Sequence, residues 1–143
     1  MAVDPEARAA AHALVARYAV AANDPASSAT ALYRVYAVVS TNLRNAVGDD
    51  GTDALLSRAM ARVDERHPAA RDLRRTATAN IDSAYLAAAV STHGEAAIRA
   101  AIEEMLGTVI ELLSRLIGGG MALRLIDHES GATSRPPTDE ASA

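Results

Sequence analysis

Four histidines are the residues of this chain best suited to proton or phosphoryl transfer near neutral pH. They are His12, His67, His93 and His128. The sequence contains no cysteine, which excludes disulfides, thiolate catalysis and cysteine-ligated metals. No Ser-His-Asp triad or pair of catalytic carboxylates can be argued, because nothing in the sequence fixes the distances between such groups. We therefore predict no catalytic residues, and we expect that the protein is not an enzyme.

His12 is the histidine with a recognisable setting. It lies on a predicted first helix, on the face opposite Leu14, so we expect its ring to be exposed. The segment Ala11-His12-Ala13-Leu14 resembles the motif of histidine phosphotransfer domains, which carry an exposed histidine on a bundle helix. That family continues with a lysine and a pair of small residues, whereas this chain continues with Val15, Ala16 and Arg17. A surface histidine and a phosphotransfer residue both stay open as interpretations of His12.

Asp64 and His67 have a spacing that could suit a metal ion, since residues three apart on a helix can reach one metal. A di-iron bundle requires two Glu-x-x-His pairs and two more glutamates that face the interior. No second pair exists here, and the helical period places Glu103, Glu104 and Glu111 on a polar face. We predict no metal site and no cofactor-binding site, and we interpret His67 as a residue near a helix C-terminus.

One stretch of the chain concentrates positive charge. Residues 58–75 contain six arginines against three acids, a net charge of +3 in a chain whose net charge is −4. Arginine binds phosphates and carboxylates through its planar fork, but no aromatic residue is interleaved to stack on bases. We expect pairing with acidic side chains, particularly Glu103, Glu104 and Glu111, and no nucleic-acid partner; anion binding is the alternative. The arginines are Arg58, Arg62, Arg66, Arg71, Arg74 and Arg75.

Alanine dominates the apolar content of the chain. Half of the 143 residues are hydrophobic, but 34 are alanine, and all 14 basic residues are arginine. Alanine favours helices and buries little area, which predicts closely packed helices around a modest core. A GC-rich bacterial genome would produce this bias, so we expect a bacterial protein. The sequence lacks a secretory signal and an uncharged apolar run of roughly 18 residues, so we expect a cytoplasmic location without a membrane partner.

Helical periodicity and capping signals predict an all-α fold. We expect one domain at residues 1–127, a bundle of about five to six helices, followed by a disordered polar tail at residues 128–143. The expected helices cover residues 5–22, 25–47, 52–67, 81–90, 95–117 and 121–127. A loop is expected at residues 48–52, and residues 68–80 are expected to be irregular.

The longest periodic segment, residues 95–117, is predicted to be the central helix. Two adjacent rows of apolar residues cover an arc of about 160°, which requires at least two neighbouring helices. The rows are Ile98, Ile102, Met105, Val109, Leu112 and Leu116, and beside them Leu106, Ile110, Leu113 and Ile117. The break Gly118-Gly119-Gly120 follows a helix rather than a strand, so it lacks the setting of a phosphate-binding loop. We interpret it as the break that folds residues 121–126 back onto the bundle, with a functional hinge as the alternative.

A longer pattern, within residues 30–127, resembles small uncharacterised bacterial all-α proteins. The resemblance implies an all-α fold and a bacterial origin, and it implies no activity. The residues that carry it are Gly48, Gly51, Leu55-Leu56, Ala59, His67-Pro68, Gly94, Ile98, Leu112-Leu113, Leu116-Ile117-Gly118 and Met121-Ala122-Leu123-Arg124-Leu125.

The apolar seams of two helices and the lack of catalytic residues lead to a prediction of function. We predict a non-enzymatic interaction or regulatory module that acts as a homodimer, or binds another protein, through apolar helix faces. One alternative is a small-molecule-binding helical module with a pocket near Met105, Met121 and Tyr85. The other alternative is a phosphotransfer protein that uses His12.

Overall fold

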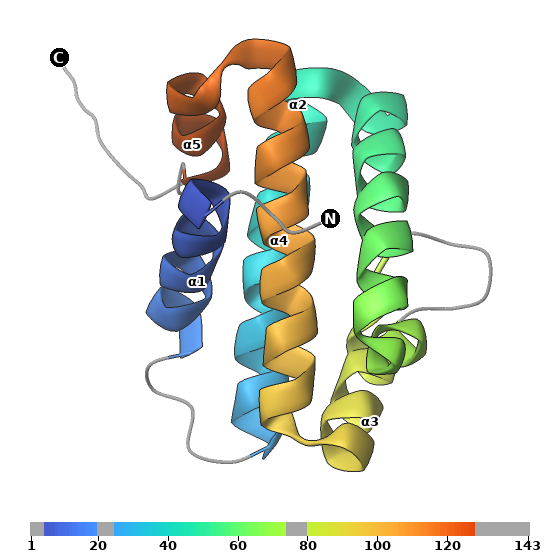
Figure 1. Cartoon of the computed structure of the whole chain (residues 1–143). Helices are drawn as coiled ribbons and strands as arrows, with labels where there is room; N and C mark the ends of the chain where they lie inside the picture. Colours follow the sequence, from blue (N-terminus) through green and yellow to red (C-terminus); the bar gives the residue numbers. More distant parts are fainter. Residues whose placement is uncertain (1–4, 20–24, 74–79, 128–143) are drawn as a thin grey trace, which may run out of the picture.

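The computed structural model describes residues 5–19, 25–73 and 80–127, and the predicted tail at residues 128–143 lies outside them. Within the described residues the protein is an all-α helical bundle without strands, as the sequence predicts (Figure 1). Its elements are α1 (Pro5–Ala19), α2 (Pro25–Arg66), the 3₁₀-helix η1 (Pro68–Leu73), α3 (Ser83–His93), α4 (Glu95–Ile117) and α5 (Gly119–Asp127).

Helix α4 is the centre of the bundle. It lies between α1 and the second half of α2, and the first half of α2 runs behind it (Figure 1). Ile98, Ile102, Met105, Leu106 and Val109 are all buried in the core. The wide apolar arc therefore has several neighbouring helices from its own chain, and the helix bounds agree with the predicted residues 95–117.

Helix α2 changes direction at a single residue. Gly48 has φ +82° and ψ 174°, and the backbone is helical on both sides of it. The predicted loop at residues 48–52 is therefore wrong, because helical geometry resumes at Asp49. Asp49 and Asp50 stand where the second half begins, and acids are favourable at a helix N-terminus. Arg44 spans the break through Asp49 and Asp53, at 3.2 and 3.3 Å.

The segment after α2 is more ordered than predicted, since η1 covers residues 68–73. Helix α3 begins at Ser83, two residues later than expected, because the Asp82 side chain caps it by accepting from the backbone N–H groups of Ala84 and Tyr85. The hydroxyl of Tyr36 in α2 accepts from the backbone N–H of Ile81, at 3.2 Å. This bond ties the start of α3 to α2.

The glycine break between α4 and α5 is one residue long. Gly118 has φ +90°, whereas α5 already includes Gly119 and Gly120. The last helix therefore begins two residues earlier than the predicted Met121. Its end is held by Asn42, whose side-chain amide donates to the carbonyl oxygen of Ile126 at 3.3 Å. Helix α5 thus folds back on the bundle.

Candidate functional site

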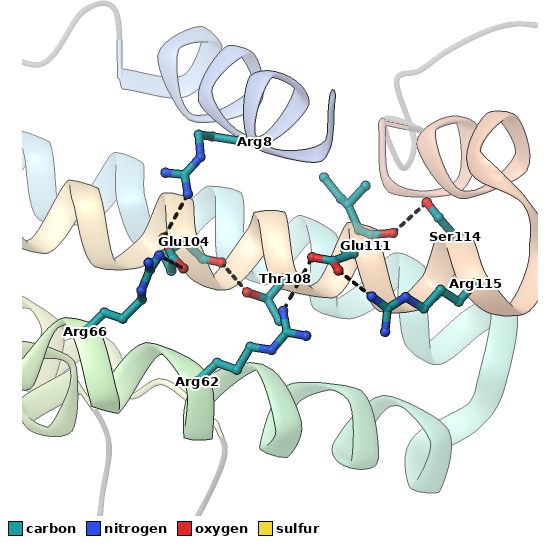
Figure 2. A network of polar contacts seen from close by, with 9 residues as sticks. Arg8, Arg62, Arg66, Glu104, Thr108, Glu111, Ser114 and Arg115 are labelled. Atoms are coloured by element: carbon teal, nitrogen blue, oxygen red, sulfur yellow. Dashed lines mark hydrogen bonds and ion pairs between the residues drawn. The ribbon is translucent and has the colours of Figure 1, made fainter. Parts of the chain in front are cut away.

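A row of polar residues follows one face of α4 and forms a polar network with the neighbouring helices (Figure 2). The row consists of Glu104, Thr108, Glu111 and Arg115, at intervals of about one helical turn. Figure 2 shows arginines approaching this row from α1 and from α2. We call these four residues the polar seam.

Glu104 is the buried carboxylate of the polar seam, with a side chain only 4% exposed. One of its carboxylate oxygens lies 3.2 Å from Arg66 in α2 (Figure 2). The other lies 3.7 Å from Arg8 in α1 and 3.9 Å from His67. Because burying a carboxylate is costly unless it is paired, these contacts explain how α4 carries a charge into the packed interface. The prediction that Glu104 occupies an exposed polar face is wrong, since α1 and α2 cover it.

Glu111 makes the second link between α4 and the arginine-rich stretch. It lies 3.4 Å from Arg62 in α2 and 2.7 Å from Arg115, one turn later in α4. Arg62 and Arg66 therefore pair within the chain with two of the predicted glutamates. Arg58 and Arg71 are exposed, and Arg74 and Arg75 lie outside the described residues.

The hydroxyl groups near the polar seam donate hydrogen bonds to main-chain carbonyl groups of α4 itself. Thr108 donates to the carbonyl oxygen of Glu104 at 2.8 Å, and Ser114 donates to that of Ile110 at 2.7 Å (Figure 2). The carboxylates face arginines and the hydroxyls face main-chain carbonyls. This arrangement connects three helices, and it places no nucleophile beside a base in the manner of an acyl-transfer site.

Asp64 and His67, whose spacing could suit a metal ion, lie at the C-terminal end of α2, where Asp64 is in the last turn and His67 follows it. His67 turns toward Glu104, at the 3.9 Å given above. Among the described residues, no group of three histidine, aspartate or glutamate side chains has a geometry that could hold a metal ion.

His12 lies on the surface of α1, with a side chain 67% exposed, as the sequence predicts. Its Nδ1 atom is 3.0 Å from a carboxylate oxygen of Glu103 in α4. This contact occupies Nδ1 and leaves the other ring nitrogen, Nε2, outside it, so the phosphotransfer interpretation of His12 stays a prediction. His93 contacts Asp72 at 2.7 Å and joins α3 to η1, while His128 lies outside the described residues.

The three residues proposed to line a ligand pocket are not brought together. Met105 is buried in the core, whereas Tyr85 and Met121 are 40% and 52% exposed. Tyr85 belongs to α3 and Met121 to α5, and these helices lie at opposite ends of α4 (Figure 1). A ligand cavity in this fold must therefore use other residues.

Large apolar side chains are exposed at one end of the bundle. They are Leu116, 69% exposed, with Met121, Ile117 and Val47 at 52, 39 and 36%. The break in α2 and the junction between α4 and α5 lie at this same end (Figure 1). We call these four residues the apolar end.

The exposure of Leu116 contradicts the prediction that the whole apolar row of α4 packs inward. Helix α1 lies beside the middle of α4 and does not reach its last turn (Figure 1). The α2 seam of Leu32, Tyr36, Val39 and Leu43 is buried in the chain's own core. The predicted surplus of apolar surface is therefore found at the apolar end and not along the helix faces. The one sequence signal that could have located it is Gly118, which ends α4 directly after two large apolar residues.

Comparison with protein-family models, with curated proteins and with solved structures finds no match to this chain. The resemblance to small bacterial all-α proteins thus stays a prediction. No helix in residues 5–19, 25–73 and 80–127 is long and apolar enough to cross a membrane.

Proposed function

We propose that this protein is a non-enzymatic, cytoplasmic interaction module that acts as a homodimer, and that the apolar end is its self-association surface. The observation that carries the proposal is the exposure of Leu116, Ile117 and Met121 around the junction of α4 and α5. Monomeric proteins rarely expose large apolar patches, and such patches commonly mark interaction sites. The other apolar rows of the described helices are occupied by the chain's own core.

Charge at the borders of the apolar end supports a second copy of this chain as the partner. The α2 side carries Asp49 and Asp53, with side chains 81 and 53% exposed. On the other side stand Arg115, with a side chain 61% exposed, and the exposed Arg124 of α5. In a two-fold symmetric interface the same patch meets itself in reverse. The acidic border of one copy would then face the basic border of the other.

Replacing Leu116 by glutamate tests the proposal. The substitution places an unpaired charge at the centre of the proposed interface, where the loss of a hot-spot residue costs about 2 kcal/mol or more. We expect the dissociation constant of the dimer to rise by roughly 30-fold or more. Sedimentation velocity over a concentration series measures this constant.

The matched control is Ala97→Glu, which adds the same charge to an exposed position near the N-terminus of α4. Acidic residues are favourable at a helix N-terminus, so this variant should fold and retain the dimer. Dimers of equal strength in the Leu116→Glu and Ala97→Glu variants would show that the apolar end is not the interface.

A further inference from the structure

The apolar row of α4 continues in the same helical register through the glycine break into α5. Alternating intervals of three and four residues, the spacing of a seam between two helices, extend from the middle of α4 to the end of α5. The folded chain does not use this continuity, because α5 turns back beside the last turns of α4 and Leu116 is left exposed (Figure 1). The residues at these intervals are Val109, Leu112, Leu116, Gly119, Leu123 and Ile126.

A single residue separates the two helices from one longer helix at residues 95–127. Gly118 has φ +90° and ψ 149°, and the backbone is helical directly before and after it. A change of these two angles to helical values would align α5 with α4. Such short connections favour the exchange of a terminal element between two copies of a chain.

The contacts of α5 in the folded chain identify what a released α5 would bind. Helix α5 packs against α4 and α2 and buries Ala122 and Ile126. Its end accepts the hydrogen bond from the Asn42 side chain in α2. The α5 of a second copy has the same sequence, so it can make these same contacts. The occupant of this position is therefore α5 itself, from either chain.

We propose that two copies of this protein exchange α5, each chain straightening at Gly118 and placing its α5 against α4 and α2 of the other. This inference rests on the proposed homodimer and specifies its structure. The two copies of Gly118 then lie at the two-fold axis. Leu116, Ile117 and Met121, which stand on either side of Gly118 and are exposed in the single chain, are covered next to this axis.

The second and third glycines of the break also support the exchange. A Cβ atom added to Gly119 or Gly120 would meet no atom within 4 Å, so the packing of the single chain does not require glycine at either position. In the exchanged dimer the two longer helices run side by side next to the axis. Residues without side chains allow two backbones to approach closely there.

Gly118→Ala tests the exchange, with Gly94→Ala as its matched control. Gly94 has φ +95° and ψ 150°, almost the conformation of Gly118, but it precedes α4 and is not part of the exchange. Alanine disfavours both conformations, yet dimer formation by exchange removes only the one at position 118. We expect the dissociation constant of the dimer to fall at least tenfold in Gly118→Ala and to stay unchanged in Gly94→Ala.

Sedimentation velocity of the full chain and both variants over a concentration series measures these constants. Circular dichroism establishes that each variant is folded. Equal dissociation constants in Gly118→Ala and Gly94→Ala would overturn the exchange of α5 and would leave the proposed homodimer intact. A single-chain mass at every concentration in all three proteins would overturn the homodimer and the exchange together.

Discussion

Glu104 shows how one residue can join three segments of this fold. Its carboxylate is buried and meets Arg66, Arg8 and His67. Replacing Glu104 by glutamine keeps the shape and removes the charge that these cations compensate. Because the arginines are about half exposed, we expect a loss of about 1–3 kcal/mol in the free energy of unfolding, below the value for a fully buried pair. Urea denaturation measures this loss.

The adjacent Glu103 provides the matched control, since its partner His12 is on the surface. Glu103→Gln should change the free energy of unfolding by less than about 1 kcal/mol, as is usual for exposed ion pairs. Equal effects of the two substitutions would contradict the structural role assigned to Glu104.

The buried hydroxyl of Tyr36 should make the free energy of unfolding depend on pH in the alkaline range. Burial raises the pKa of its hydroxyl, and the hydrogen bond from the Ile81 N–H opposes this shift only in part. The folded state thus favours the protonated hydroxyl. The resulting stability is fully present below the pKa of an unfolded tyrosine, about 10, and is lost as pH rises through the folded-state pKa.

The Tyr36→Phe substitution isolates this contribution. Near neutral pH the free energy of unfolding of the variant should be lower by about 1–2 kcal/mol, because the Ile81 N–H is left without its acceptor. Above about pH 10 the difference between the two proteins should shrink. Urea denaturation at a series of pH values provides the comparison, with Tyr33→Phe as a control that keeps the Tyr36 hydroxyl. A difference that stays constant with pH would be evidence against the role of Tyr36.

At the scale of the elements, the glycines between α4 and α5 have unequal roles. Gly118 has φ +90° and ψ 149°, a conformation that costs other residues about 1–3 kcal/mol. Gly119 and Gly120 are helical, and a Cβ atom added at either would meet no atom within 4 Å. Gly118→Ala should therefore lower the free energy of unfolding, whereas Gly119→Ala and Gly120→Ala should each raise it by about 0.4–1 kcal/mol.

Thermal and urea denaturation of the three single variants check this order. A destabilised Gly119→Ala variant would mean that the break extends beyond Gly118. The same measurement tests the hinge interpretation. If all three glycines formed a flexible hinge, the three substitutions should have similar effects on the free energy of unfolding.

The sequence was sufficient to predict where most of the helices lie. Helix α4 agrees with the predicted residues 95–117, because Gly94 and Gly118 bound a strongly periodic segment. The length of the break in α2 was overestimated, and the reason is physical. Gly48 and Gly51 together indicate a loop, yet a single glycine with positive φ is enough to redirect a helix. Local patterns identify such breaks but not how many residues they occupy.

At the scale of the whole molecule, helical periodicity could not predict which neighbour covers each face. It assigned Glu104 to the exposed side and Leu116 to the buried side of α4, and both assignments were wrong. The reason lies in the lengths and positions of the other helices. Helix α1 and the second half of α2 cover the middle of α4, while its last turn extends beyond α1 (Figure 1). The apolar end depends on this packing, which is why it could not be located from sequence alone.

The oligomeric state of the unmodified protein tests the central proposal most directly. Sedimentation velocity over a series of concentrations yields the mass of the species in solution. We predict a species of twice the chain mass of 14.9 kDa, dissociating on dilution. A mass of one chain at every concentration would contradict the proposal that the apolar end joins two copies of this protein.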